Sequence, residues 1–440
     1  MDVRVRERVV RRHPSAPEAV GWIARTLEDA GFETWVVGGA VRDVLLGVES
    51  VDWDLATRAR PEQVRRLFRR TVPVGIEHGT VGVLAQDGTM YDVTTFRRDV
   101  ETQGRHATVE FADQLDDDLS RRDFTINSVA WHPLRDEFYD PFDGVKDLEL
   151  GILRTVGPPA DRLAEDYLRV LRALRFAGRF ELTVDQATWD ALCAATGQLG
   201  ILSPERVREE LLKVLAGDSQ PSRALSLYAA AGVLDPLMPE LAELVGAKRG
   251  EAIVDAWSYA LLVVDALLRQ RPVLRLAALL QGTSPRAAAQ LLIRLRFSNT
   301  HADTVVALVR AGSSPPPATA TSADRRRWLS RVGAARLPEL ARIWCGQQRV
   351  EQALGATSPT DAAGAWRSFR SELRKAPPLA VSDLAVDGND LIGAGIKPGP
   401  RFGKILDALL DRVLEDPSLN RRDGLLAMAT ELATNAPAGE

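Results

Sequence analysis

The chain has 440 residues, more than one hydrophobic core usually supports, so we expect between two and four domains. Hydrophobic residues make up 45% of the sequence and charged residues 26%, which is typical of a globular protein and excludes disorder over most of the chain. The formal net charge is −4, so overall charge gives no argument for nucleic-acid binding, which would need local basic patches.

The first 150 residues alternate short runs of strand type with helical ones. Strands are predicted at Thr34 to Val37, Val51 to Thr57, Val72 to Ile76, Thr80 to Leu84 and Tyr91 to Phe96. Helices are predicted at Ala40 to Leu46 and at Pro61 to Arg70, where a proline suits the first helical position. We therefore expect a small mixed sheet with helices.

After Gly157 the strand signal almost vanishes, and apolar residues recur at helical spacing. The helical segments are 163–176, 207–215, 224–231 and 252–268. A stretch rich in Pro, Ser, Ala and Thr, from Ser313 to Ser322, is the expected linker. The predicted fold class is α+β, with a mixed sheet at the N-terminus and an all-α remainder.

The cysteine pattern and the apolar segments bear on location. Cys193 and Cys345 lie far apart and outside any Cys/His spacing, so we expect neither a disulfide framework nor a zinc site. The arginine-rich N-terminus has no apolar core of signal-peptide length, and the longest apolar stretch, Tyr259 to Leu268, is too short to span a bilayer. We expect a cytoplasmic protein with no membrane partner.

Two aspartates alternate with apolar residues in the segment Val51 to Leu55. In a strand, Asp52 and Asp54 project from the same face. Paired carboxylates repel each other unless a cation lies between them, and Mg²⁺ prefers oxygen ligands. The pair indicates a metal site for phosphoryl transfer. The motif alone also fits two acids on a solvated surface.

A glycine pair, Gly38-Gly39, follows a strand and opens a helix ten residues before these aspartates. Glycines let backbone N–H groups approach an anion, and the helix N-terminus carries partial positive charge. Arg42, in the first turn of that helix, could then reach a triphosphate. The dinucleotide pattern G-x-G-x-x-G is absent. A packing turn is the alternative for the glycine pair alone.

Four motifs together resemble a known family. They are Gly38 to Asp43, Asp52 to Asp54, Arg121 to Asn127 and Glu165 to Arg169. Their order and spacing are similar to the class II tRNA nucleotidyltransferases, which include CCA-adding, CC-adding and A-adding enzymes and bacterial poly(A) polymerases. The resemblance covers nearly the whole chain. It implies a catalytic head (1–150), a nucleotide-selecting neck (151–235), a helical body (236–312) and an RNA-binding tail (323–440).

The resemblance implies further site residues in the head. Asp92, on a later strand, could complete the metal site, or it could be an edge-strand aspartate making a turn contact. Arg122 and Asp123 are similar to the family segment that contacts ribose and phosphates, and Asn127 would fix that turn. A structural Arg/Asp ion pair is the alternative.

Base selection can be argued from helix geometry. On a helix from Leu163 to Arg175, Asp166 and Arg169 are three residues apart and lie on one face, and Arg172 and Arg175 continue this stripe of predicted nucleotide-binding residues. Cytosine and adenine both present an amino group beside a ring-nitrogen acceptor, so a carboxylate and a guanidinium together select them. Glu165, on another face, is expected to brace the helix. A surface ion pair is the alternative.

The resemblance also implies roles for two segments outside these motifs, one in the head and one in the body. Phe96 to His106 is similar to the flexible loop that repositions when selection changes from C to A, although this chain has Gln103 where relatives often carry an acid. Leu274 to Thr283 lies where many relatives carry a His-Asp metal pair, which is absent here, so the body is expected to lack that chemistry.

We therefore predict an RNA nucleotidyltransferase that uses Mg²⁺, CTP and ATP and acts on the tRNA 3′ end. Poly(A) synthesis and partial CC or A addition are alternatives with the same chemistry. An RNA-binding protein on a degenerate scaffold is less favoured, because clustered acids repel RNA. Nucleotidyl transfer to a small molecule would leave the helical half unexplained. The sequence leaves the oligomeric state open.

Overall fold

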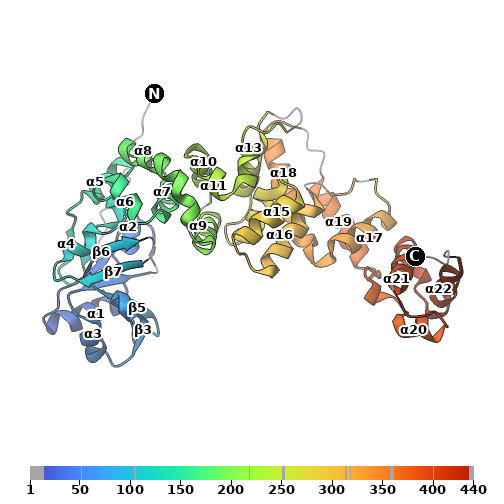
Figure 1. Ribbon diagram of the computed structural model, residues 1–440, viewed down its shortest axis with the longest axis horizontal. Helices are drawn as coiled ribbons and strands as arrows, with labels where there is room; N and C mark the ends of the chain where they lie inside the picture. Colours follow the sequence, from blue (N-terminus) through green and yellow to red (C-terminus); the bar gives the residue numbers. More distant parts are fainter. Residues whose placement is uncertain are drawn as a thin grey trace. The chain divides into compact units, whose positions relative to one another are not determined.

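The computed structural model describes residues 14–50, 52–103, 106–217, 219–249, 253–312, 315–317, 319–356, 361–399 and 401–435. The chain divides into two compact units between Ala242 and Glu243. Figure 1 shows strands only among the blue to green elements of the first unit, and helices throughout the second. In the ranges above, no helix is long and apolar enough to cross a membrane.

The first unit begins with a seven-stranded mixed sheet. Its strands are β1 (Thr34–Val37), β2 (Asp54–Thr57), β3 (Thr71–Gly75), β4 (Thr80–Leu84), β5 (Met90–Thr95), β8 (Ala130–His132) and β9 (Glu137–Tyr139). The order is β3-β4-β5-β2-β1-β8-β9, and all neighbours are antiparallel except the parallel pair β2 and β5. The five predicted strands are present, whereas β8 and β9 were not predicted.

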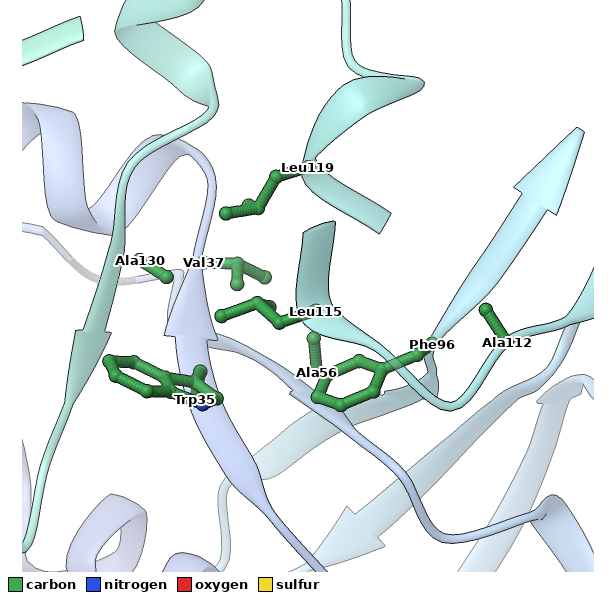
Figure 2. Close-up of a cluster of buried hydrophobic side chains, with 8 residues drawn as sticks. All are labelled: Trp35, Val37, Ala56, Phe96, Ala112, Leu115, Leu119 and Ala130. Carbon is green, nitrogen blue, oxygen red and sulfur yellow. The ribbon is translucent and has the colours of Figure 1, made fainter. Parts of the chain in front are cut away.

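Helices cover both faces of this sheet. They are α1 (Glu18–Asp29), α2 (Gly39–Leu45), α3 (Pro61–Leu67) and α4 (Leu115–Ser120), whereas α5 (Gly144–Leu150) packs against the turn Thr125–Asn127 and the short strand Ile152–Leu153. Contacts of α1 and α3 with the strands place both on one face. On the other face, Leu115 and Leu119 of α4 pack on Trp35, Val37 and Phe96, as Figure 2 shows. Side chains alternate between the two faces along β1, and all four of them are buried. Both faces of this strand are therefore covered by other parts of the protein.

A separate hairpin replaces the loop expected from Phe96 to His106. Its strands β6 (Arg97–Gln103) and β7 (His106–Phe111) pair antiparallel, so the segment that resembles the family's flexible loop forms two paired strands. The segment is rich in Thr and Val, which favour extended backbone. Gly104 and Arg105 lie outside the described residues. At the base of the hairpin, Arg60 donates to the carbonyl oxygen of Ala112 at 2.9 Å.

The rest of the first unit is helical apart from one short strand pair. Its helices are α6 (Pro159–Glu165), α7 (Leu168–Phe180), α8 (Gln186–Ala195), α9 (Pro204–Gly217), α10 (Ser222–Ala230), α11 (Leu234–Leu237) and α12 (Pro239–Ala242). The pair is β10 (Ile152–Leu153) with β11 (Thr183–Val184). A Cβ on Gly178 of α7 would lie 2.5 Å from the backbone nitrogen of Ala224 in α10, so only glycine allows this close packing.

The second unit is all helical in the residues described, as expected. Its helices are α13 (Ala256–Asp265), α14 (Pro272–Leu279), α15 (Pro285–Arg294), α16 (Asn299–Ala311), α17 (Ser322–Val332), α18 (Leu337–Ala353), α19 (Ala362–Leu373), α20 (Gly388–Gly393), α21 (Arg401–Glu415) and α22 (Arg422–Asn435). Arg326 of α17 pairs with Glu372 of α19 at 2.6 Å and donates to the carbonyl oxygen of Leu414 in α21 at 2.7 Å. This buried arginine therefore joins three helices. Part of the predicted linker Ser313 to Ser322 lies outside the described residues, and Ser322 itself opens α17.

Candidate active site

The register of the sheet brings the glycine pair and the aspartates together. Val37, the last residue of β1, lies opposite Asp54, the first residue of β2. The chain leaves β1 through Gly38, and a Cβ placed there would lie 3.9 Å from Oδ2 of Asp54. Antiparallel pairing therefore explains why two motifs separated in sequence form one site.

The parallel pairing of β2 with β5 brings in the third aspartate. Leu55 lies opposite Val93, so Asp54 and Asp92 occupy neighbouring positions one residue earlier. Because β5 lies between β4 and β2, the interpretation of Asp92 as an edge-strand residue is wrong. Burial and the charges of Asp52 and Asp92 raise the pKa of Asp54 to about 6, against the opposing effect of Arg122. Burial and then Asp52 also raise the pKa of Asp92.

Asp52 precedes the strand that was predicted to contain it. Strand β2 begins only at Asp54, so the prediction of a strand from Val51 was wrong for its first residues. Trp53 is buried and donates its indole N–H to the carbonyl oxygen of Ser50 at 3.1 Å, which fixes the segment without strand pairing. Asp52 and Asp54 nevertheless line the same cavity, of about 690 Å³.

These carboxylates suit a divalent cation. Nucleotidyltransferases generally use a divalent metal ion. Among the described residues, no group of three or more His, Cys, Asp and Glu side chains is arranged to hold one. Mg²⁺ commonly takes only one or two carboxylates and completes its shell with water and substrate phosphates. The pKa of Asp54 is raised first by burial and then by the negative charges of Asp52 and Asp92, and such an ion would compensate these charges.

The glycine turn packs against Arg122. Gly38 has φ of 79°, in the left-handed region that favours glycine, and a Cβ there would lie 3.0 Å from Nη1 of Arg122. Nη2 of Arg122 donates to Asp118 at 2.9 Å. Its Nε is buried without a hydrogen-bond partner in the described part of the chain. The guanidinium is thus held beside the aspartates with donor capacity left over.

Arg42, expected to reach the triphosphate, has partners inside the protein. Its Nε and Nη2 donate to Asp43 at 2.9 and 2.7 Å, and its Nη1 donates to Asn127 at 2.5 Å. The guanidinium lies 5.0 and 4.6 Å from the ring centroids of Phe176 and Phe180 on α7. Burial lowers the pKa of Arg42, with Asp43 opposing. Arg42 lines the cavity and also ties α2 to α7.

Asn127 and Asp123 continue this network into the neck. The 3₁₀ turn η2 (Thr125–Asn127) places the amide nitrogen of Asn127 2.8 Å from Oδ1 of Asp123. Arg172 of α7 donates to Oδ2 of Asp123 at 2.8 Å from Nε and pairs with it at 2.6 Å from Nη2. Burial raises the pKa of Asp123, but Arg172 and Asn127 outweigh it and hold the pKa below its ordinary value. Structural ion pairing, the alternative considered for this segment, is therefore present.

The neck helix is broken where a continuous helix was expected. Helix α6 ends at Glu165, Asp166 has extended backbone (φ −157°, ψ 104°), and α7 begins at Leu168. The carboxylate of Asp166 accepts the backbone N–H of Leu168 at 3.1 Å, two residues further on, which forms a local turn before α7. The prediction of a helix from Leu163 to Arg175 with Asp166 and Arg169 on one face is wrong in this respect, although both residues line the cavity.

Arg206 of α9, and not Arg169, is the partner of Asp166. Its Nη1 and Nη2 donate to the two carboxylate oxygens at 3.0 and 2.5 Å. Arg169 donates to Glu165, to the carbonyl oxygen of Arg162 at 2.6 Å and to that of Arg121 at 3.2 Å. Glu165 thus braces this region, as expected.

Arg175 lies in the wall of the cavity with its charge compensated. Its Nε donates to Glu210 of α9 at 2.6 Å, and both side chains are buried. Its guanidinium lies 4.3 Å from the ring centroid of Phe176. Lys213, one turn further along α9, pairs with the same glutamate at 3.0 Å.

Twelve of the thirteen predicted site residues line this one cavity, and Asp92 is the exception. The sequence analysis did not assign to the site the lining residues Asp43, Ser50, Arg121, Arg179, Arg206 and Lys213. Arg206 and Lys213 are seven residues apart on α9 and so share a face. That spacing was available as a signal, whereas nothing local to Arg206 indicated its pairing with Asp166.

A mixed sheet that presents paired aspartates beside a glycine turn, facing an arginine-lined helical wall, defines a nucleotidyltransferase. Three family models match the chain: "Poly A polymerase head domain" over residues 34–154, "Probable RNA and SrmB- binding site of polymerase A" over 181–244, and "tRNA nucleotidyltransferase domain 2 putative" over 273–429. The chain belongs to the CCA-adding enzyme family of tRNA nucleotidyltransferases.

Relatives of the chain match along almost their whole length. The CCA-adding enzyme of Lactiplantibacillus plantarum is 34% identical over 423 residues, covering 96% of this chain and 97% of that protein. The enzyme of Levilactobacillus brevis is 31% identical, covering 93% and 96%. The crystal structure of the Bacillus stearothermophilus CCA-adding enzyme in complex with CTP has a TM-score of 0.72 at 29% identity, covering 95% and 97%.

Proposed function

We propose that this protein adds C and A, from CTP and ATP, to the 3′ end of tRNA without a nucleic-acid template. The observation that carries the proposal is the single cavity that holds Asp52 and Asp54 together with Asp166 and Arg169. Phosphoryl transfer and base selection then have separate residues within reach of one nucleotide. The curated relatives, named CCA-adding enzymes, support CCA as the product.

Asp52 and Asp54 are the residues that we propose to hold Mg²⁺. When bound there, the ion supplies charge neutralisation at the triphosphate and lowers the pKa of the attacking hydroxyl. Asp92, one strand away and outside the lining of the cavity, adds negative charge that favours cation binding at Asp54.

The glycine turn and Arg122 are the elements that we propose to bind the triphosphate. Gly38 and Gly39 leave the backbone free of side chains at the mouth of α2, where an anion is favoured. Arg122 adds a guanidinium held in place by Asp118. Arg42 supports this end of the cavity through Asp43 and Asn127.

Asp166 is proposed to accept the amino group of C or A. Its Oδ1 already accepts two hydrogen bonds, from Arg206 and from the backbone of Leu168, whereas Oδ2 accepts one from Arg206. A carboxylate oxygen has two lone pairs, so Oδ2 retains one acceptor position. Three of the five N–H groups of Arg169 have partners in the described part of the chain, which leaves donors for a ring nitrogen.

Uracil and guanine present a carbonyl oxygen where cytosine and adenine present the amino group. A carboxylate only accepts hydrogen bonds and so cannot donate to that oxygen, and Arg206 already pairs with both oxygens of Asp166. The same geometry therefore accepts C and A and rejects U and G. Arg172 and Arg175 hold Asp123 and Glu210 and so support the wall behind the base.

We propose the domain limits given by the resemblance, with a head over 1–150, a neck over 151–235, a body over 236–312 and a tail over 323–440. We also propose the cytoplasm as the location, because two cysteines without a partner fit a reducing compartment.

The test is incubation of the protein and Mg²⁺ with tRNA that lacks its last three nucleotides. CTP alone, ATP alone, both together, and UTP or GTP are supplied, and products are resolved at single-nucleotide length. We expect two additions with CTP and a third only when ATP is also present. Long adenosine tails from ATP alone would instead indicate a poly(A) polymerase, and absence of any RNA product would contradict the proposal.

A further inference from the structure

The second unit contains an apolar pocket that lies outside the proposed nucleotide site. Its volume is about 500 Å³, within the roughly 300 to 1,000 Å³ typical of small-molecule sites. It lies among the segment that follows α13, the start of α14, and the helices α18 and α19. Its lining residues all belong to the second unit, whereas those of the nucleotide cavity all belong to the first. The two cavities therefore share no residue.

One face of α18 forms a wall of this pocket. Arg342, Cys345 and Arg349 follow one another at steps of three and four residues, so they share a face of the helix. Leu340 and Trp344 of the same helix do not line the pocket and are fully buried in the core. The pocket is therefore bordered by the face of α18 that the core does not use.

Apolar side chains make up most of the remaining lining. Leu267 and Leu274 are buried at the pocket, Leu268 is 65% exposed, and Trp366 of α19 is half-buried. An aliphatic or aromatic group that bound here would remove apolar surface of Leu268 and Trp366 from water, which favours binding. This part of the pocket therefore suits the apolar body of a ligand.

The charge at the pocket is positive and is not neutralised by the protein. Arg271, Arg342 and Arg349 line it, and none of the described lining residues is acidic. Arg342 donates to the carbonyl oxygen of Pro338 at 3.0 Å, and Arg349 donates to those of Cys345 and Ala266 at 3.3 and 3.4 Å. The guanidinium of Arg271 has no hydrogen bond or ion pair within the residues described. Because a carbonyl oxygen carries no net charge, three guanidinium groups remain available to an anion.

We propose that this pocket binds a small carboxylate with an unbranched aliphatic chain. The carboxylate pairs with the guanidinium groups of Arg342 and Arg349, which present paired N–H donors to such an anion. The chain covers Leu268 and Trp366. An RNA backbone fits this lining poorly, because it carries a charge at every nucleotide and would leave the apolar wall unused. A cationic ligand would be repelled by the arginines.

Cys345 provides the readout for binding of decanoate, the probe, to the full chain. Cys345 lines the pocket, and Cys193, half-buried in the first unit, is the control in the same molecule. The alkylation rate of each thiol by iodoacetamide is followed by peptide mass spectrometry, with decanoate below its micelle concentration. At about ten times its Kd, decanoate should slow alkylation of Cys345 roughly tenfold, because only free protein reacts. The rate at Cys193 should not change.

Ligand analogues separate the contribution of the chain from that of the charge. From hexanoate through octanoate to decanoate, each added methylene should strengthen binding roughly threefold, as burial of apolar surface predicts. Decylamine and decanol, which have the same chain without the carboxylate, should bind roughly tenfold or more weakly than decanoate.

Two arginine variants with the same loss of charge test the assignment to this pocket. Arg342→Gln/Arg349→Gln should weaken decanoate binding roughly tenfold, because it removes the paired donors. Arg286→Gln/Arg367→Gln removes two exposed arginines that do not line the pocket and should leave binding unchanged. Ala363→Trp, at an exposed position in the lining, should fill the pocket, so that decanoate no longer raises the Tm. Circular dichroism confirms that each variant is folded.

Several results would overturn the inference. Equal weakening in the two arginine variants, or equal protection of Cys345 by decylamine, would show that the pocket does not recognise a carboxylate. Protection of Cys345 by tRNA and not by decanoate would make the pocket an RNA contact. Alkylation of Cys345 that slows as protein concentration rises, without any added ligand, would mean that a second copy of the chain covers the pocket. None of these results bears on nucleotide addition, which is measured separately.

Discussion

Replacing Arg206 by glutamine tests whether Asp166 selects the base. Arg206 donates to both oxygens of that carboxylate, at 3.0 and 2.5 Å. Hydrogen bonds between charged groups contribute roughly 1.5 to 3 kcal/mol when shielded from water. The side chains of Arg206 and Asp166 remain 25% and 22% exposed, so water screens the pair. We therefore expect Arg206→Gln to lose about 1.4 kcal/mol of the free energy that holds Asp166 in place.

A loss of that size corresponds to about a tenfold change in a rate ratio. We expect the ratio of kcat/KM for CTP to that for UTP to fall about tenfold in Arg206→Gln, because Asp166 can then rotate away from the base. The KM for the triphosphates should change little, since we propose that Gly38 and Arg122, and not Arg206, bind the triphosphate. Arg206→Lys, which keeps the charge but loses the paired donors, should give an intermediate ratio.

The assay is single-nucleotide addition to tRNA with each of the four triphosphates. Arg223→Gln is the matched control, because Arg223 forms a neck ion pair with Glu181 at 2.6 Å away from the cavity. It should leave the base preference unchanged. A folded Arg206→Gln enzyme with wild-type base preference and a uniformly lower rate would refute the reasoning and would mean that selection lies elsewhere.

Three further outcomes follow from the head. Asp54→Asn should abolish nucleotide transfer yet raise the free energy of unfolding at pH 8 by about 1 kcal/mol. The variant removes a carboxylate whose pKa is raised to about 6, and such a group destabilises the folded protein when it is charged. Lower stability in thermal melts would contradict this. Gly38→Ala should cost about 1 to 2 kcal/mol and raise the KM for CTP, because a Cβ there meets Arg122; unchanged melts and kinetics would count against it. Burial lowers the pKa of His132, whose Nδ1 accepts two backbone N–H groups and whose Nε2 lies beside Glu28. The free energy of unfolding should therefore fall as the pH drops below about 6.5, where the unfolded histidine takes up a proton. In urea titrations His132→Gln should lose this part of the pH dependence, and curves identical to the wild type would argue against it.

The parts of the site that the sequence predicted are those set by local pattern. The strand at Thr34 to Val37 and the helix after it were predicted because an apolar run ends in two glycines. Asp52 and Asp54 were placed on one face by alternation, and both line the cavity although only Asp54 is in a strand. Period-two and glycine signals are properties of neighbouring residues, so one sequence suffices to detect them.

The break at Asp166 could not be predicted from periodicity. Apolar residues continue at helical spacing from Leu163 to Leu174, because both α6 and α7 bury one face. Where α6 ends, the carboxylate of Asp166 accepts the backbone N–H of Leu168 and pairs with Arg206, forty residues away in sequence. Interactions over that separation depend on the packing of α9, which no local pattern specifies.

Arg42 shows the same dependence on distant residues. Its place after two glycines indicated a phosphate ligand, yet its partners are Asp43, Asn127 and two phenylalanine rings on α7. Asn127 in turn holds Asp123, and Asp123 holds Arg172 of the same helix. A continuous chain of hydrogen bonds therefore runs from the glycine turn to the neck helix.

We expect these hydrogen bonds to affect base selection, because they join the two ends of the cavity. The proposed triphosphate-binding residues lie at α2 and the proposed base-selecting residues lie around α7, and Arg42, Asn127 and Asp123 join the two groups. A buried polar network with every link satisfied has few alternative arrangements, so it fixes the distance between its ends. An enzyme that reads a base with no partner strand requires such a fixed distance, because a base edge misplaced by about 1 Å loses its hydrogen bonds. We therefore expect the ion pairs of this region to fix the distance between the proposed triphosphate-binding residues and the proposed base-selecting residues, whatever they add to stability.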